Sequence, residues 1–467
     1  MRKIPIIILV VALIFSCRKN QLQLPPAPGE LPVTITLNQS QAGYSIPPTF
    51  EGLSFETKIL TNNPGFLNVN NPVLIQMIRN LGPGVLRIGG ETCDEVFWSD
   101  NPRNPSSGRD TLTISDIDRL AAFSMAIGWQ VLFGLNLGSN DLVKSSNEAA
   151  YAGNRLAGNL LAFQSGNEPD VFHNGIRPRT YNFSNFQDEW EAYLTAIKTK
   201  VPNASFAGPD VAYNTDWITA FAVEEHYNIK LLDCHYYMAG PATSPNINYQ
   251  TILADDGNLP GYLAIIKSQA KKYNLPYRIS ESNNVYGGGK AGVSDVFASA
   301  LWALDFMWII AENNGSGINF HTGDGLFYSP ISTQNGVLQA NPEYYAMLAF
   351  NYASTGGKII PASISNSELC SAYACVKPDN SYVLTLINKD EKNNASVTIL
   401  LNKTASGIQI QRLTAPSLNV ATGITFAGST VNADGTFEAK TTEQYAVAGN
   451  SVVVKVPAGS AAIVTVR

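Results

Sequence analysis

The chain has 467 residues, of which 45% are hydrophobic and 10% aromatic, and this is enough apolar material to fill two folded units. Charged residues make up only 15%, and the formal net charge is −6. Binding to nucleic acid needs a basic surface, so this balance argues against a nucleic-acid partner. It fits a protein that handles neutral or locally recognised substrates.

The first residues predict export. Arg2 and Lys3 precede an apolar run over residues 4–15, which is too short to span a membrane and fits a signal peptide. The run ends in Ile14-Phe15-Ser16-Cys17, which resembles the lipobox of bacterial lipoproteins, so residues 1–17 are interpreted as a lipoprotein signal with Cys17 as the lipidated residue. The alternative is an ordinary secretory leader with a chance cysteine. Residues 18–30, with three prolines, are interpreted as a tether. The expected location is therefore the bacterial cell envelope, lipid-anchored and either periplasmic or on the cell surface.

From residue 49 to residue 354, short apolar runs alternate with longer amphipathic segments. The apolar runs predict buried parallel strands at 50–56, 85–89, 130–137, 160–166, 205–209, 231–237, 277–281 and 317–321. The amphipathic segments predict helices, among them 72–81, 114–127, 186–200, 260–273, 293–312 and 343–352. Eight strands, each followed by a helix, predict an α/β fold of the (β/α)8 TIM-barrel type over residues 49–354.

After Gly356 the pattern changes to short β-rich runs between turn signals. The predicted strands are 371–376, 382–386, 396–401, 408–413, 445–448, 451–455 and 461–466, with turns that include Asp434-Gly435 and Gly449-Asn450. This spacing predicts an all-β antiparallel sandwich over residues 357–467. Residues 31–48, ahead of the barrel, include an alternating run at 33–37 that could add a strand to this sandwich.

Four cysteines remain after Cys17, and none of them has metal-ligand spacing. Cys370 and Cys375 share one extended segment, where their opposite parity points them to opposite faces. Free, buried cysteines are therefore expected, and neither a metal nor a cofactor is predicted.

Polar residues gather where the predicted barrel strands end, which is where the loops of such a barrel build an active site. They are Glu56, Thr57, Arg87, Asn136, Asn167, Glu168, Asp170, Asp210, His235, Tyr236, Tyr237, Glu281, Asn283, Asn284 and His321. Two glutamates stand out, because Glu168 ends the fourth strand and Glu281 the seventh, nearly across the barrel mouth. Hydrolysis of a glycosidic bond needs two carboxyls on opposite sides of a sugar, and a separation of about 5–5.5 Å gives retention of configuration.

Asn167-Glu168-Pro169 on strand four, with a second glutamate on strand seven, resembles clan A of the glycoside hydrolases. The resemblance implies that Glu168 is the acid/base and Glu281 the nucleophile. The finer resemblance is to glycoside hydrolase family 79, the β-glucuronidase and heparanase-like family. It runs through the barrel and the C-terminal domain, on the segments LSFET (53–57), LRIGG (86–90), SGNEPD (165–170), GPD (208–210), HYY (235–237), SESNNVYGGG (280–289) and NFHTG (319–323).

The family resemblance also implies a set of sugar-binding residues. Tyr237, Tyr286 and Gly288 stand where the family grips the uronic carboxylate, and His321 and Tyr328 stand where it lines the sugar pocket. Glu56 and Asp94 resemble the acids that hold sugar hydroxyls, although the run Glu91-Thr92-Cys93-Asp94 departs from the family's usual small polar residue.

Local chemistry is compatible with these roles. Three glycines at 287–289 let a backbone approach a ligand closely, although they also suit a merely flexible loop. Alternate parity lets at most one of Tyr236 and Tyr237 point into the site.

The two glutamates are expected to divide the chemistry. Arg87 is expected below Glu281, holding the nucleophile ionised. Glu168 is expected in a more apolar setting as the proton donor. Asn167 is expected to donate to the 2-hydroxyl, an interaction that strengthens in the transition state.

The sequence therefore predicts a retaining β-glucuronidase acting on a glycan or glycoconjugate that carries β-linked glucuronic acid. One alternative is a clan A β-glycosidase or endo-glycanase that acts on a neutral sugar. Another is a catalytically inactive, lipid-anchored glycan-binding protein. The natural substrate, exo or endo action and the oligomeric state are left open.

Overall fold

The computed structural model describes residues 29–38, 43–102, 110–366 and 368–467. The predicted signal peptide, Cys17 and the tether up to residue 28 lie outside these described residues, so those interpretations stay predictions. None of the described helices is long and apolar enough to cross a lipid bilayer.

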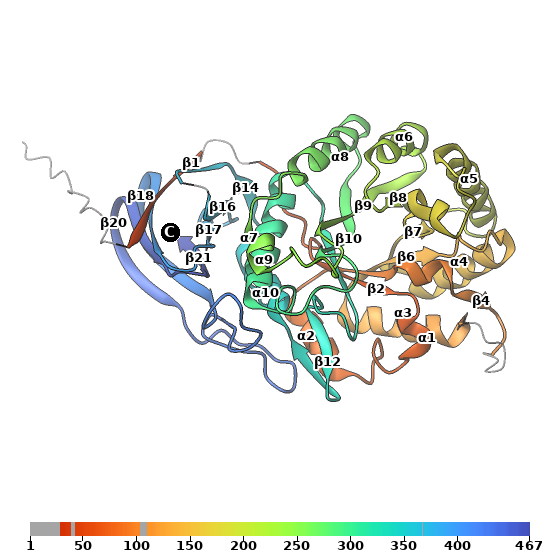
Figure 1. Cartoon of the computed structure of the whole chain (residues 1–467), viewed down its shortest axis with the longest axis horizontal. Helices are drawn as coiled ribbons and strands as arrows, with labels where there is room; N and C mark the ends of the chain where they lie inside the picture. The colour runs from red at the N-terminus through yellow and green to blue at the C-terminus, as the bar shows by residue number, and fades with distance from the viewer. Residues whose placement is uncertain (1–28, 39–42, 103–109, 367) are drawn as a thin grey trace, which may run out of the picture.

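Eight parallel strands close into a barrel (Figure 1). In chain order they are β2 (Gly52–Glu56), β3 (Val85–Gly89), β6 (Gln130–Leu135), β7 (Leu160–Ser165), β8 (Phe206–Val211), β9 (Ile229–Ala239), β10 (Tyr277–Val285) and β11 (Ile318–Thr322). The ring closes where Phe320 of β11 pairs with Leu53 of β2. Almost every residue of these strands is buried, as expected for strands covered on both sides.

Helices follow the strands and form the outer layer. They are α1 (Ile59–Asn62), α2 (Pro72–Asn80), α3 (Ile114–Ile127), α4 (Leu142–Leu156), α5 (Phe183–Lys200), α6 (Thr215–Glu225), α7 (Tyr249–Leu253), α8 (Leu259–Tyr273), α9 (Phe297–Glu312) and α10 (Pro342–Ser354). Local signals set their ends, as in α3, where Thr113 and Asp116 form a capping box and Gly128 ends the helix at φ 74°.

Shorter elements lie in the loops between strands and helices. They are the 3₁₀ turns η1 (Glu91–Asp94), η3 (Ala157–Asn159) and η4 (Pro169–Asn174), the strand pair β4 (Phe97–Ser99) and β5 (Thr111–Thr113), and the hairpin of β12 (Ile331–Gln334) and β13 (Val337–Ala340).

A separate β domain lies on the α9 and α10 side of the barrel (Figure 1). Its strands are β1 (Glu30–Leu37), β14 (Lys358–Ile360), β15 (Ala362–Ile364), β16 (Cys370–Val376), β17 (Tyr382–Asn388), β18 (Asn394–Thr414), β19 (Thr425–Phe426), β20 (Glu443–Val456) and β21 (Ser460–Val466). They form one mostly antiparallel sheet in the order β14-β16-β17-β21-β18-β1-β15, with β19 and β20 also on β18. The predicted fold class, a (β/α)8 barrel followed by an all-β domain, is confirmed.

Three details of the β domain differ from the sequence analysis. The runs 396–401 and 408–413 belong to one long strand, β18, and the two runs around Gly449-Asn450 belong to β20. The turn predicted at Gly449-Asn450 is wrong, because the pairing between β18 and β20 shifts register between Leu400 and Gly407 and both strands continue. Such an irregularity lets a pair of strands bend together, so the sheet folds over its own apolar core. The domain is also not purely antiparallel, because β1 pairs with β18 in parallel.

The two domains share a packed interface. Trp308 of α9 stacks on Tyr373 of β16, with the ring centroids 5.7 Å apart, and the Tyr373 hydroxyl donates to Asp305 Oδ1 at 2.6 Å. Cys370 and Cys375 are free and buried on opposite faces of β16, one in the β domain's own core and the other in the core shared with the barrel.

Candidate active site

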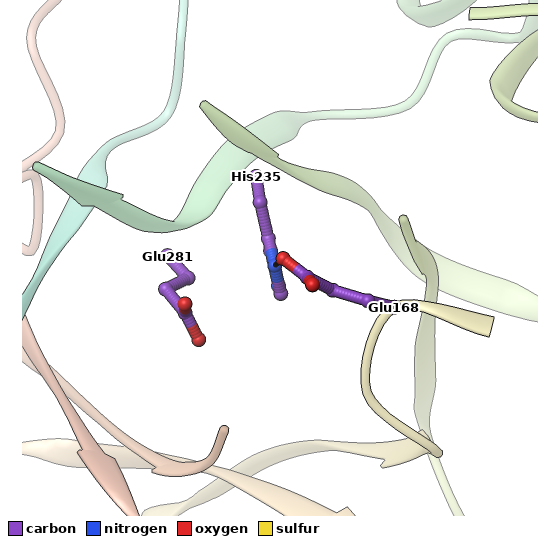
Figure 2. Close-up of side chains that lie close together, drawn as sticks. All are labelled: Glu168, His235 and Glu281. Atoms are coloured by element: carbon purple, nitrogen blue, oxygen red, sulfur yellow. Dashed lines mark hydrogen bonds and ion pairs between the residues drawn. The ribbon is translucent and has the colours of Figure 1, made fainter. Parts of the chain in front are cut away.

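Glu168, just after β7, and Glu281, within β10, face one another, and His235 of β9 lies beside Glu168 (Figure 2). One carboxylate oxygen of each glutamate and one ring nitrogen of His235 lie within 4.8 Å of one another. This is close to the separation of about 5–5.5 Å found in retaining glycosidases and too short for the water that an inverting enzyme must hold.

Backbone irregularities aim these side chains. Glu168 has φ 53°, in the left-handed region, and Pro169 directly after it begins the turn η4. Its backbone N–H donates to the Asp210 carbonyl at 2.9 Å. The pairing of β10 with β9 shifts register between Ile279 and Glu281, and such bulges re-aim side chains next to active sites.

Glu281 sits in a strongly cationic surrounding. Its Oε2 accepts from Arg87 Nη1 at 2.7 Å, its Oε1 accepts from the Tyr237 hydroxyl at 2.9 Å, and His321 Nδ1 lies 3.5 Å away. Burial opposes ionisation of this carboxyl, but the charges of His321, His235 and Arg87 outweigh burial and lower the pKa of Glu281 well below its usual range. The side chain is therefore an anion at neutral pH, as a nucleophile requires.

Arg87 is fully buried under the site and organises it. Its guanidinium pairs with Asp210 at 2.6 Å as well as with Glu281, and it also donates to Asn167 Oδ1 at 2.8 Å. Burial would lower the pKa of Arg87, but the two carboxylates raise it above its ordinary value. A buried cation needs such pairing, so the arginine stays charged and fixed. The guanidinium of Arg87 beside Glu281 also makes the cluster of Glu168, His235 and Glu281 a poor site for a second cation such as a metal ion (Figure 2).

His235 is a site residue that the sequence analysis placed at a strand end but gave no role. Its Nδ1 lies 2.8 Å from Glu168 Oε1, and its Nε2 lies 2.9 Å from Asp210 Oδ1. Burial would lower the pKa of His235, but Asp210, Glu281 and the hydrogen bonds raise it well above 6.5. The apolar setting expected for Glu168 is therefore wrong, because the imidazole of His235 lies within hydrogen-bonding distance of this carboxyl group.

Glu56 and His321 form a second polar pair. His321 Nε2 lies 3.4 Å from Glu56 Oε1, and Thr92 donates to Glu56 through its backbone N–H at 2.8 Å and its hydroxyl at 2.5 Å. Burial raises the pKa of Glu56, but His321 and Thr92 bring it below its ordinary value. Burial likewise works against the charge of His321, but Glu281 and Glu56 raise its pKa. Thr92 was not singled out from the sequence, because its role depends on the turn η1.

The predicted tyrosines gather on one side of Glu281. The Tyr237 ring lies 6.4 Å from Tyr286 and 6.3 Å from Tyr328, and Tyr328 lies 6.2 Å from His321. Tyr286 is 47% exposed, whereas Tyr328 is buried. Tyr236 points the other way, where its hydroxyl donates to Asp256, so only one of the two neighbouring tyrosines reaches the site.

The three glycines at 287–289 form a turn with a defined backbone conformation. Gly287, Gly288 and Gly289 all have positive φ, at 84°, 91° and 77°. A Cβ on Gly289 would lie 2.9 Å from the ring and the backbone nitrogen of Tyr328. The Gly288 carbonyl accepts from Phe327 N–H at 2.8 Å, which ties this loop to the loop that carries Tyr328. Glycine is therefore required here by conformation.

Asp94 holds loops in place. Its carboxylate accepts from the backbone N–H groups of Leu137, Gly138 and Asn167 at 2.7–2.9 Å. Burial raises its pKa to about 7 against the effect of these donors. The carboxylate thus connects the loops after β6 and β7, and its contact with a sugar hydroxyl stays a prediction.

The barrel and the two glutamates that face one another in its mouth define a glycoside hydrolase of the clan A type. Residues 372–463 match the glycosyl hydrolase family 79 C-terminal beta domain, which confirms the resemblance to that family. The chain is 25% identical to a β-glucuronidase of Aspergillus niger over 89% of this chain and 90% of that protein. It is 23% identical to heparanase-like protein 3 of Arabidopsis thaliana over 73% of this chain and 68% of that protein.

Solved structures share the fold. The chain resembles a 4-O-α-L-rhamnosyl-β-D-glucuronidase from Fusarium oxysporum with a TM-score of 0.77 and 21% identity, covering 92% of this chain and all of that one. A family 51 arabinofuranosidase from Xanthomonas axonopodis pv. citri gives a TM-score of 0.68 at 16% identity, covering 94% of this chain and all of that one.

Proposed function

We propose that this protein is a retaining β-glucuronidase in which Glu281 is the nucleophile and Glu168 the acid/base. The observation that carries the proposal is the approach of the two carboxylates within 4.8 Å across the barrel mouth, with only one of them held by a buried arginine. That asymmetry matches the two roles, since one carboxylate must stay ionised while the other exchanges a proton.

In the first step Glu281 attacks the anomeric carbon, and Glu168 protonates the departing oxygen. Glu168 Oε1 lies 2.8 Å from His235 Nδ1, close enough for a proton to pass between them, so we take this pair as the proton source. In the second step Glu168 takes a proton from water, and that water hydrolyses the glycosyl ester. Arg87 can bind only the oxygen of the Asn167 amide, so the amide NH₂ is left to donate to the 2-hydroxyl.

Support for glucuronic acid comes from the Tyr286–Gly288 turn and from the relatives. A tyrosine hydroxyl and a backbone N–H can hold a carboxylate without burying a further cation. Tyr237, which was assigned to the same task, is engaged with Glu281 in this structure, so Tyr286 and Gly288 are the main candidates. The A. niger relative and a Neurospora crassa relative at 26% identity are both named β-glucuronidase.

The test is a comparison of three 4-nitrophenyl β-glycosides, the glucuronide, the glucoside and the xyloside. Preferred cleavage of the glucuronide, with the β-anomer as the first product by NMR, supports the proposal. Preferred cleavage of a neutral glycoside favours the neutral-sugar alternative. Binding without any turnover favours an inactive glycan-binding protein.

Glu281→Gln checks the assignment within the same experiment. The variant should lose turnover and still bind glucuronic acid, because the amide keeps the shape of the carboxylate. Near wild-type turnover in this variant would rule out Glu281 as the nucleophile.

We also propose that the protein is exported and anchored to the envelope by lipid on Cys17. This rests on the basic start, the short apolar run and the Ile14-Phe15-Ser16-Cys17 motif. Detergent phase partitioning of the full chain against Cys17→Ala tests it. The wild-type protein should enter the detergent phase and the variant should not, whereas equal partitioning would favour an ordinary secretory leader.

A further inference from the structure

Tyr213 presents an aromatic ring on the catalytic face of the barrel. It lies in the short loop between the C-terminal end of β8 and the start of α6, and it is 70% exposed. An exposed aromatic residue is common on protein surfaces and by itself indicates little. The backbone that carries this ring, however, is hydrogen-bonded to a buried carboxylate.

Asp170 anchors the loop. Its carboxylate accepts from the backbone N–H groups of Ala212 at 2.9 Å, Tyr213 at 3.4 Å and Asn214 at 3.2 Å. Asn214 then caps α6 by accepting from the first backbone N–H groups of the helix. Asp170 lies two residues after Glu168, so the backbone of Tyr213 is fixed relative to the proposed acid/base.

We propose that Tyr213 is the platform of the leaving-group subsite and stacks on a flat apolar face, either an aryl ring or the apolar face of a pyranose. The inference rests on the proposed roles of the two glutamates. Because Glu168 protonates the glycosidic oxygen, the leaving group must lie on the Glu168 side of the site. Because the backbone is already held, stacking has to order only the two side-chain torsions of the tyrosine.

The test compares two glucuronides with different leaving groups. 4-Nitrophenyl β-glucuronide carries an aryl group that can stack on the ring, whereas β-glucuronyl fluoride carries one that is too small. Aromatic pairing is worth about a 2- to 12-fold change in an equilibrium. Tyr213→Ala should therefore lower kcat/KM for the aryl glucuronide by about this factor, mainly through KM, and leave the fluoride unchanged. Tyr213→Phe should restore the aryl activity.

The matched control is Tyr227→Ala, since Tyr227 is 90% exposed just beyond the other end of α6. It should change neither substrate. An equal loss on both substrates in Tyr213→Ala, or no loss on the aryl substrate, would overturn the inference. If the wild-type protein cleaves no glucuronide, the proposed function fails, and the same pair of leaving groups is tested on the glycoside that it does cleave.

Discussion

The hydrogen bond from Tyr237 to Glu281 allows a quantitative test of how the nucleophile is kept ionised. The hydroxyl donates to Glu281 Oε1 at 2.9 Å and helps to lower the pKa of that carboxyl. A hydrogen bond to a charged group contributes about 1.5–3 kcal/mol, and one pKa unit corresponds to about 1.4 kcal/mol. Tyr237→Phe should therefore raise the pKa of Glu281 by about 1 to 2 units.

The assay is the pH dependence of kcat/KM, which reports the ionisation of the free enzyme. Activity requires the deprotonated Glu281, so the acid limb of the profile should move to higher pH by the same amount. Tyr236→Phe is the matched control, because that neighbouring hydroxyl also donates to a carboxylate, Asp256, but outside the barrel. If folded Tyr237→Phe gave a profile that superimposes on the wild type, this account of the low pKa would be refuted.

Three further predictions concern the acid/base, the bridging histidine and the glycine turn. Glu168→Ala should lose about 10²- to 10⁴-fold in kcat/KM on glucuronides with poor leaving groups but far less on 2,4-dinitrophenyl glucuronide. Added azide should react with the glycosyl ester of this variant to give the β-glucuronyl azide. Formation of the α-azide would contradict retention. His235 has a raised pKa in the folded state, so its stabilisation is complete below about pH 6.5 and is lost as pH rises through the folded value. Urea unfolding between pH 6 and pH 9 should therefore show a stability loss that His235→Gln reduces, and an unchanged slope would count against the bridge. Gly289→Ala should destabilise the fold by about 1–3 kcal/mol, and by more than Gly292→Ala, which has a similar φ of 73° but no atom within 4 Å of its Cβ.

The barrel was predictable because its strands are short, buried on both sides and therefore apolar along their whole length. The helices were less predictable from the sequence. α4 buries serine, alanine and one glutamate, and Leu156 is the only large apolar residue on its buried face, so few residues mark that face in the sequence. In the β domain the turn signal at Gly449-Asn450 marks a register shift within β20, since glycine serves bulges as well as turns.

In the candidate site, too, local features could be predicted from the sequence and contacts between distant segments could not. The strand to which a residue belongs is a local property, so Glu168, Glu281 and Arg87 could be found by counting strands, although β10 continues to Val285, beyond the end predicted at Glu281. The role of His235 depends on carboxylates from two other strands, and no spacing within the chain encodes that meeting. The hydrogen bonds from three backbone N–H groups to Asp94 are equally non-local, because the two loops that Asp94 joins lie 43 to 73 residues further along the chain.

These contacts form a single alternating chain of charges across the barrel mouth. In order, its members are Glu168, His235, Asp210, Arg87, Glu281, His321 and Glu56, joined by contacts of 2.6–3.5 Å. Each cation lies between two carboxylates. When Glu281 becomes an uncharged ester, the Glu168–His235 pair gives one proton to the leaving group, so the pair gains the negative charge that Glu281 loses and the total is unchanged. The buried cations between them therefore never face a net loss of counter-charge, which in a low-dielectric site would be costly. The first step of the proposed double displacement thus leaves the summed charge of these seven groups unchanged.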